Sequence, residues 1–257
     1  MVKAVILAGG LGTRFGKETT LRPKPLIEIG GRPVLWHIMK LYAHHGVREF
    51  VICAGHRADA VVDFFVGYQS RFGDVEIDLL DGTVKLLRRP AEDWRIQIID
   101  TGAATETGGR LKRISPLVAD NEFFLLTYGD TLTDVDVRGT IAYHRSHGRL
   151  ATVTVVSPRN RFGKVTIEDG VVTEFREKHL ESPLQLSAGF FVLSPKVLSY
   201  IAGDETVWEQ SPLERLAEDR QLMAWRHDGF WQPMDTTVER DLLNRLWDGG
   251  CAPWKVW

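Results

Sequence analysis

A glycine-rich stretch near the start of the chain has the residue types needed to bind phosphate. An apolar run, Val5 to Ala8, opens directly into Gly9, Gly10, Leu11 and Gly12. A buried strand that ends in glycines presents bare backbone N–H groups at the C-terminal edge of a sheet, and such amides bind anions. Glycine suits the position because phosphate must approach the backbone closely. The stretch therefore predicts a phosphate-binding loop.

Two basic side chains supply the positive charge that amides lack. Arg14 follows the loop, so its guanidinium can reach phosphate oxygens. Lys24 lies between Pro23 and Pro25, which extend and stiffen the chain around it. Together these groups suit a polyphosphate. On the residues alone, an ordinary glycine turn and a solvent-exposed arginine stay open as alternatives.

The glycine spacing differs from the two commonest nucleotide-binding motifs. The sequence contains no G-x-x-x-x-G-K-[ST] P-loop, and Gly10, Gly12 and Gly16 miss the G-x-G-x-x-G spacing. A dehydrogenase with a dinucleotide-binding fold is therefore disfavoured.

Two aspartates are candidate metal ligands. Asp130 ends an apolar strand in TYGD, and Asp235 lies far along the chain in PMDT. Carboxylate oxygens with few other protein contacts suit Mg²⁺, which keeps waters and shares phosphate oxygens. On the residues alone, Asp130 is equally well explained as the cap of a turn. We find no G-x-S-x-G elbow, so positioning and charge neutralisation are expected instead of a covalent nucleophile.

Alternating strands and helices must position these groups. A helix is expected from Pro33 to Gly46, and strands are expected at Glu49 to Gly55 and Trp94 to Gly102. This β-α-β order predicts a parallel sheet with right-handed crossovers. A strand pair around Asp81-Gly82 is expected over the edge of this half, and a helix over residues 108–119.

The second half is richer in strands. Strands are expected over residues 150–158 and 184–194, a hairpin around Asp169-Gly170, and a last helix from Val238 to Trp247. The stretch FWQPMDT is expected to form a turn.

The composition is that of an ordinary soluble chain. The 257 residues are 44% hydrophobic and 26% charged with a net charge of -2, so neither nucleic acid nor membrane is an expected partner. Two cysteines give no disulfide framework, and the first apolar run is too short for a signal peptide. We expect a cytoplasmic enzyme. Tryptophans crowd the C-terminal stretch, which predicts a packed tail, with a second subunit as one candidate surface.

The stretch LAGGLGTRF followed by RPKPLIEIGGRPVLWHIM resembles the signature of the sugar nucleotidyltransferases, which join a sugar 1-phosphate to a nucleoside triphosphate and release pyrophosphate. Within that family the chain is most similar to the glucose-1-phosphate cytidylyltransferases. The resemblance covers essentially the whole chain and is carried also by DTG, TGGRLKRI, TYGD, GFFVLSPKV, FWQPMDT and APWKVW.

The resemblance implies an α/β fold with a Rossmann-like, mixed but mostly parallel sheet flanked by helices, and a smaller β-rich lobe. We expect one domain over residues 1–257, with a nucleotide-binding half at about 1–130 and a sugar-binding half at about 131–257. Because members of this family assemble into homo-oligomers, the resemblance also implies a homo-oligomer.

The resemblance also implies roles for individual residues. Arg14, Lys24 and Asp130 are the expected catalytic residues, and Asp130 and Asp235 the expected Mg²⁺ ligands. The expected nucleotide-binding residues are Leu7, Ala8, Gly9, Gly10, Leu11, Gly12, Thr13, Arg14, Lys24, Thr105, Arg110 and Gly129. The expected sugar-binding residues are Tyr128, Gly129, Glu177, Lys178, Ser187 and Gly189. Without the resemblance, Arg110 would be a solvated arginine near a helix start.

The chain departs from the cytidylyltransferase pattern where the sugar is expected. Thr131 replaces a glycine, His179 a proline, and Ser187-Ala188 an asparagine-glycine pair. CTP and α-D-glucose 1-phosphate are the first-choice substrates. Another hexose, heptose or octose 1-phosphate, another triphosphate (GTP, UTP or dTTP), and a non-catalytic nucleotide-sugar-binding relative stay open.

Overall fold

A seven-stranded sheet forms the centre of the protein. The computed structural model describes residues 2–12, 15, 19, 22–157, 164–168, 171–176 and 184–257. The strands follow the order β14-β10-β13-β8-β1-β4-β7 across the sheet. They span β1 (Lys3–Leu7), β4 (Glu49–Ala54), β7 (Arg95–Asp100), β8 (Phe124–Tyr128), β10 (Ala151–Val156), β13 (Leu186–Leu193) and β14 (Leu222–His227). Strand β13 runs antiparallel to both neighbours and the other pairs are parallel, which confirms the predicted mixed, mostly parallel sheet.

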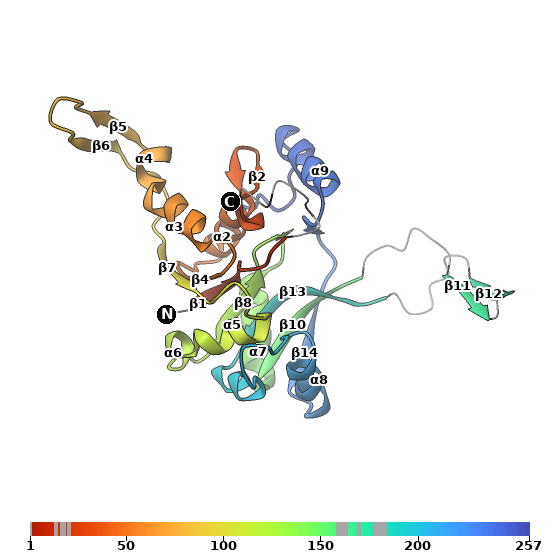
Figure 1. The fold of residues 1–257 in the computed structure, drawn as a ribbon. Helices are drawn as coiled ribbons and strands as arrows, with labels where there is room; N and C mark the ends of the chain where they lie inside the picture. Colours follow the sequence, from red (N-terminus) through yellow and green to blue (C-terminus); the bar gives the residue numbers. More distant parts are fainter. Residues whose placement is uncertain are drawn as a thin grey trace.

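Helices cover both faces of this sheet. Helices α2 and α3 lie on one side and α5 and α6 on the other (Figure 1). The helices span α2 (Val34–His44), α3 (Ala58–Val66), α4 (Tyr68–Phe72), α5 (Thr107–Arg113), α6 (Ser115–Val118), α7 (Val137–His147), α8 (Ser211–Glu218) and α9 (Thr237–Asp248). The 3-10 helices η2 and η3 span Lys24–Leu26 and Pro195–Tyr200. The expected helix over residues 108–119 is divided, because α5 ends before Pro116.

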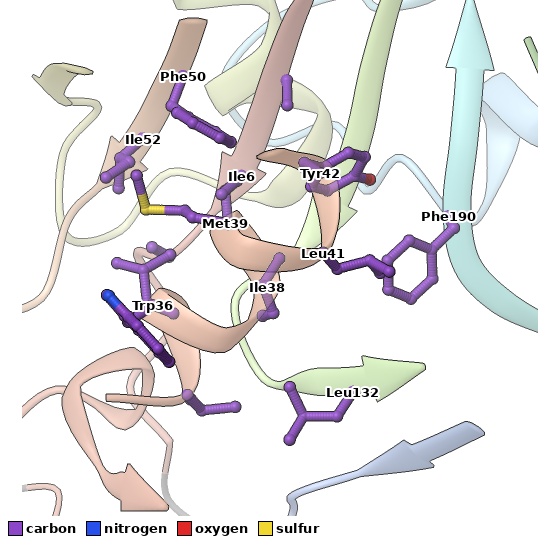
Figure 2. Packing of buried hydrophobic residues seen from close by; sticks show 14 of the residues in the cluster. Ile6, Trp36, Ile38, Met39, Leu41, Tyr42, Phe50, Ile52, Leu132 and Phe190 are labelled. Atoms are coloured by element: carbon purple, nitrogen blue, oxygen red, sulfur yellow. The ribbon is translucent and has the colours of Figure 1, made fainter. Parts of the chain in front are cut away.

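The alternation of side chains along the buried strands builds two hydrophobic cores. Ile6 of β1 packs in the core on the α2 side, where Ile38 and Tyr42 lie close to it (Figure 2). Val5 points the other way and packs in the second core together with Leu111 of α5. A strand whose residues are buried on both faces belongs in the middle of an α/β sheet, which is where β1 lies.

Among the residues that the structure describes, four strand pairs stand outside the main sheet. They are β2 (Glu28–Ile29) with β3 (Arg32–Pro33), β5 (Asp74–Ile77) with β6 (Val84–Arg88), β9 (Thr131–Thr133) with β15 (Trp231–Pro233), and β11 (Lys164–Glu168) with β12 (Val171–Arg176). The expectation that the β5–β6 pair lies over the sheet edge is wrong, because this hairpin projects away from the body (Figure 1). The expected turn at FWQPMDT is wrong too, because β15 forms there.

The tryptophan-rich tail packs on its own chain. Trp254 is buried, stacks on Phe230 and Trp247, and donates from Nε1 to Nδ1 of His37 on α2. Trp254 is therefore covered by residues of its own chain and not by a second subunit. None of the helices in the described residues has the length and apolar composition needed to cross a membrane.

Candidate active site

A cavity of about 280 Å³ opens at the carboxyl ends of β1 and β8. This is the sheet edge at which parallel α/β folds bind ligands. The cavity is lined by Leu7, Ala8, Gly9, Gly10, Gly12, Lys24, Pro25, Thr105, Glu106, Thr107, Arg110, Tyr128, Gly129, Asp130 and Asp235. Most residues that the sequence pointed to, from the glycine loop to both aspartates, thus lie around one space.

Arg110 lies beneath the glycine loop with its guanidinium buried. Its Nη1 donates to the carbonyl oxygens of Ala54 (3.1 Å) and Gly102 (2.8 Å), and its Nη2 donates to that of Gly9 (3.0 Å). Burial lowers its pKa from the usual value, but arginine still remains charged. Arg110 therefore links the carboxyl end of β4 with the chain segments that follow β1 and β7. Its contact with a nucleobase stays a prediction.

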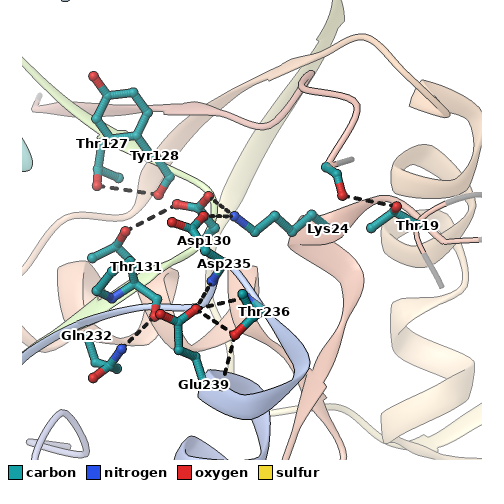
Figure 3. Close-up of polar contacts among 12 residues, drawn as sticks. Thr19, Lys24, Thr127, Tyr128, Asp130, Thr131, Gln232, Asp235, Thr236 and Glu239 are labelled. Carbon is teal, nitrogen blue, oxygen red and sulfur yellow. Dashed lines mark hydrogen bonds and ion pairs between the residues drawn. The ribbon is translucent and has the colours of Figure 1, made fainter. Parts of the chain in front are cut away.

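Lys24 is buried in the cavity wall beside the glycine loop, where a Cβ on Gly12 would lie 3.3 Å from Cβ of Lys24. It starts η2, where Pro23 takes the N-cap position. Its Nζ donates to Oδ2 of Asp130 at 2.5 Å and to Oδ1 of Asp235 at 2.6 Å, so one ammonium bridges the two carboxylates (Figure 3). An ammonium in a poorly solvated wall needs such counter-charges, because burying it alone would be costly.

The β9–β15 ladder explains how the two aspartates meet. Thr131, the first residue of β9, pairs with Pro233, the last residue of β15. The N–H of Met234 then donates to the carbonyl of Asp130 at 2.9 Å. Asp130 immediately precedes one strand and Asp235 follows the other by two residues, so the pairing places both at the same end of the ladder.

Each aspartate is held by its neighbours. Thr236 is the N-cap of α9 and forms a capping box with Glu239. The same Glu239 carboxylate accepts the backbone N–H of Asp235 at 2.6 Å, which fixes the backbone that carries this carboxylate (Figure 3). Thr131, one of the residues that departs from the family pattern, donates from Oγ1 to Oδ1 of Asp130 at 3.2 Å.

The two carboxylates fit a divalent ion that keeps most of its own ligands. Asp130 and Asp235 both reach one small cation, the Lys24 ammonium, so their oxygens are close enough to share a metal ion. No cluster of three or more His, Cys, Asp or Glu side chains that could hold a metal occurs in the described part of the chain. A metal here would take its remaining ligands from water and phosphate, which is the usual habit of Mg²⁺.

The predicted sugar side is only partly in contact with the cavity. Tyr128 lines it, and its ring packs over Gly189, where a Cβ would lie 2.5 Å from Cδ2 of Tyr128. Gly189 has a φ of +78°, so glycine is needed there for both reasons. Ser187 is exposed and does not line the cavity. Ala188, which departs from the family pattern, is buried in the core on the α2 side.

The remaining predicted residues divide into two groups. Thr13, Arg14, Glu177, Lys178 and His179 lie outside the described residues, so their roles stay predictions. Leu11 is described, but its side chain is 56% exposed and does not line the cavity.

Sequence reasoning missed three residues of the cavity wall, namely Pro25, Glu106 and Thr107. The signals were present in the same stretches. Pro25 was interpreted only as a stiffener of Lys24, and Thr107 only as the first residue of a family motif. A helix that begins beside a phosphate loop exposes its first amides and hydroxyls toward the ligand, which would have indicated Thr107.

Comparison with known proteins agrees with this geometry. A family profile described as "Nucleotidyl transferase" matches residues 3–229. The glucose-1-phosphate cytidylyltransferase of Salmonella typhi is 46% identical over 256 residues, covering 100% of both chains. The probable glucose-1-phosphate cytidylyltransferase of Bacillus subtilis is 42% identical over 257 residues, again covering 100% of both.

Solved structures share the fold at much lower identity. HddC from Yersinia pseudotuberculosis superposes with a TM-score of 0.69 at 20% identity, over 96% of this chain and 100% of its own. An apo UDP-glucose pyrophosphorylase also gives 0.69 at 14% identity, over 97% and 99%. Taken with the profile match and the full-length relatives, the glycine-loop cavity and its paired aspartates show that the chain belongs to the nucleotidyl transferase family of enzymes.

Proposed function

We propose that the chain joins a sugar 1-phosphate to a nucleoside triphosphate and releases pyrophosphate, with CTP and α-D-glucose 1-phosphate as its substrates. The observation that carries the reaction is the Lys24 ammonium held between Asp130 and Asp235 in the wall of the glycine-loop cavity. The choice of CTP and glucose 1-phosphate is supported by the names of the full-length relatives.

The reaction needs two polyanions to meet. A phosphate oxygen of the sugar 1-phosphate attacks the α-phosphorus of the triphosphate, a new O–P bond forms, and the bond from the α-phosphorus to the bridging oxygen breaks. That oxygen leaves with pyrophosphate and carries the electron pair of the broken bond. No proton transfer is required, because the attacking oxygen is already anionic, so the protein's task is positioning and charge stabilisation.

The residues divide this task. Backbone amides of the glycine loop and Arg14 would hold the triphosphate, and Lys24 would approach the α-phosphate, where negative charge must be neutralised during attack. Asp130 and Asp235 would hold Mg²⁺, which when bound screens the phosphates and lowers their resistance to attack. The contacts of Lys24 with both carboxylates support a role for it between the triphosphate and the metal.

The sugar-binding side completes the proposal. Glu177 would accept sugar hydroxyls and Lys178 would bind the sugar phosphate, with Tyr128 and Gly129 in the adjoining wall. In this arrangement one domain has a nucleotide-binding half at about residues 1–130 and a sugar-binding half at about 131–257.

Self-association is part of the proposal. The projecting β5–β6 hairpin exposes apolar side chains, including Leu79 at 90% and Leu80 at 97%. An isolated two-stranded hairpin is only marginally stable in water, so contact with a second copy of the chain would stabilise it. Light scattering after size exclusion should give an oligomer, and changing Leu79 and Leu80 to serine should lower its mass. A wild-type protein that is monomeric at every concentration would contradict this part.

A pyrophosphate-release assay tests the reaction. Purified protein with Mg²⁺ is offered each of the four nucleoside triphosphates against a panel of hexose, heptose and octose 1-phosphates, and CTP with glucose 1-phosphate should give the highest kcat/KM. A better rate with another pair would keep the reaction and correct the substrates. Tight nucleotide-sugar binding without turnover for any pair would overturn the reaction and favour a non-catalytic binding protein.

A further inference from the structure

Glu209 bridges two walls of the cavity although it does not line the cavity itself. It lies in the short connection between η3 and α8. Its Oε2 accepts the hydroxyl of Thr107 at 2.6 Å, and its Oε1 accepts the hydroxyl of Tyr128. Thr107 begins α5 and Tyr128 ends β8, and both line the cavity. One carboxylate therefore joins the two elements that meet at this edge of the sheet.

The connection that carries Glu209 is firmly anchored. The preceding residue, Trp208, is fully buried and packs edge-on against Phe191 of β13. The backbone N–H of Trp208 donates to Oγ1 of Thr107 at 2.9 Å. Close beside it, the carbonyl of Thr206 accepts the N–H of Gly108 at 2.8 Å. Glu209 is thus exposed, but its backbone is held in place because the residues that precede it are bonded to α5.

Tyr128 depends on Glu209 for the position of its hydroxyl. The phenol hydroxyl of Tyr128 donates to Oε1 of Glu209. The ring rests on Gly189, which leaves no room on that side for a side chain. The ring points away from the Lys24–Asp130–Asp235 group (Figure 3), while the backbone of Tyr128 leads directly into Gly129 and Asp130.

We propose that Glu209 is a positioning residue for the sugar 1-phosphate, and that it acts through Tyr128. The Tyr128 ring packs over Gly189 and against the core that contains Val5, while the Glu209 carboxylate holds its hydroxyl. Removing the carboxylate leaves the hydroxyl end of the ring without this partner, so the wall next to Gly129 and Asp130 loosens. Thr107 keeps its bond from the Trp208 N–H, so the α5 wall is disturbed less. This inference rests on the proposed function, because it assigns a substrate to the Tyr128 wall.

A double-mutant cycle tests the link. Glu209→Ala and Tyr128→Phe are each expected to raise KM for the sugar 1-phosphate about tenfold, the range of one hydrogen bond to a charged group, while KM for the triphosphate stays within about twofold. The double variant should be no worse than either single variant, because both remove the same bond. Glu218→Ala, which removes an exposed carboxylate from the last turn of α8, is the matched control and should leave both constants unchanged.

Other results would overturn the proposal. Additive losses in the double variant would show that Glu209 does not act through Tyr128, and equal rises in both KM values would show a general loss of structure. Glu209→Gln, which keeps the size and one acceptor oxygen, should recover part of the loss. Failure of that recovery with a normal melting temperature would also count against the proposal.

The inference and the proposed function fail in different ways. If the wild-type protein turns over no substrate pair, the proposed function is wrong. The Glu209–Tyr128 bond can still be measured by the near-ultraviolet difference spectrum between wild type and Glu209→Ala. That tyrosine signal should disappear in the Tyr128→Phe background, and its persistence would contradict the link.

Discussion

Lys24 and Asp235 are 211 positions apart in the chain, yet the ammonium of one lies 2.6 Å from Oδ1 of the other. The contact is possible because the β9–β15 ladder brings Asp235 beside Asp130 and the two prolines around Lys24 hold it in η2. The ammonium already neutralises part of the negative charge of the two carboxylates. It should therefore weaken their attraction for a divalent metal ion.

We predict that Lys24→Met has opposite effects on metal binding and on turnover. Without the ammonium, Asp130 and Asp235 lose their counter-charge, so Mn²⁺ should bind the substrate-free protein about tenfold more tightly. At the same time kcat should fall about 100-fold or more, because the positive charge near the α-phosphate is lost. Free Mn²⁺ is measured by electron paramagnetic resonance. The control is Lys85→Met, which removes a lysine paired with Glu76 on the distant β5–β6 hairpin. Unchanged Mn²⁺ affinity would contradict the prediction.

We predict that Asp130→Asn and Asp235→Asn each abolish metal-dependent turnover without unfolding the protein. In either variant Lys24 keeps one carboxylate partner, so circular dichroism and the melting temperature should stay close to those of the wild type. Asp248→Asn, an exposed change at the far end of α9, should keep full activity. Near-normal rates with Mg²⁺ in either active-site variant would remove that residue from the metal site.

We predict that two adjacent glycines of the loop respond differently to alanine. A Cβ on Gly9 would lie 2.1 Å from Nη1 of Arg110, whereas a Cβ on Gly10 would meet nothing within 4 Å. Gly9→Ala should therefore lower the melting temperature by about 3–10 °C, as overpacking of a buried site does. Gly10→Ala should leave stability unchanged but raise KM for the triphosphate, because Gly10 lines the cavity. Equal melting temperatures for the two variants would show that Arg110 does not confine Gly9.

We predict that the protein loses stability as the pH falls from about 6.5 to about 4, the range set by its buried histidines. Burial lowers the pKa of His37 from 6.5 to about 4. Since Trp254 Nε1 can only donate, His37 Nδ1 accepts from it and Nε2–H donates to the carbonyl of Ile29. Protonation would break this arrangement. Burial also lowers the pKa of His144 to about 4.

The sign follows from proton uptake. Between these pH values the unfolded chain binds protons on both histidines and the folded chain does not, so stability is fully present above the unfolded pKa and is lost toward the folded one. The loss should be about 2–3 kcal/mol for each histidine. Urea midpoints at pH 7, 5.5 and 4.5 measure it. His37→Gln should flatten this pH dependence relative to the wild type, and an unaltered slope would exclude His37 as a cause.

The fold could be predicted largely from the sequence because its signals are local. Apolar runs that end in glycine, such as the one before Gly9, mark buried strands, and periodic apolar residues after Pro33 mark α2. The wrong predictions concern elements whose formation depends on tertiary contacts. A three-residue strand such as β15 has too few residues to show alternation, and it forms only because β9 supplies its partner.

The sequence was enough to predict which residues form the candidate site, but not which contacts they make with one another. Lys24, Asp130 and Asp235 stood out by their stretches, yet nothing in the sequence showed that one ammonium bridges both carboxylates. Arg110 lines the cavity, as expected for a nucleotide contact that stays a prediction, but the sequence did not show that its guanidinium also donates to carbonyls under the loop. Glu209 gave no signal, because its role depends on two hydroxyls that only folding brings to it.

The β9–β15 ladder also affects when the protein can become active during synthesis. The strand that brings Asp235 to Asp130 follows β1, β4 and β8 in chain order, so a nascent polypeptide can complete these three strands before its second carboxylate exists. Until β15 has been synthesised, the Lys24 ammonium would have only Asp130 as its acidic partner from this pair. We therefore expect a nascent chain that lacks β15 not to consume nucleotide.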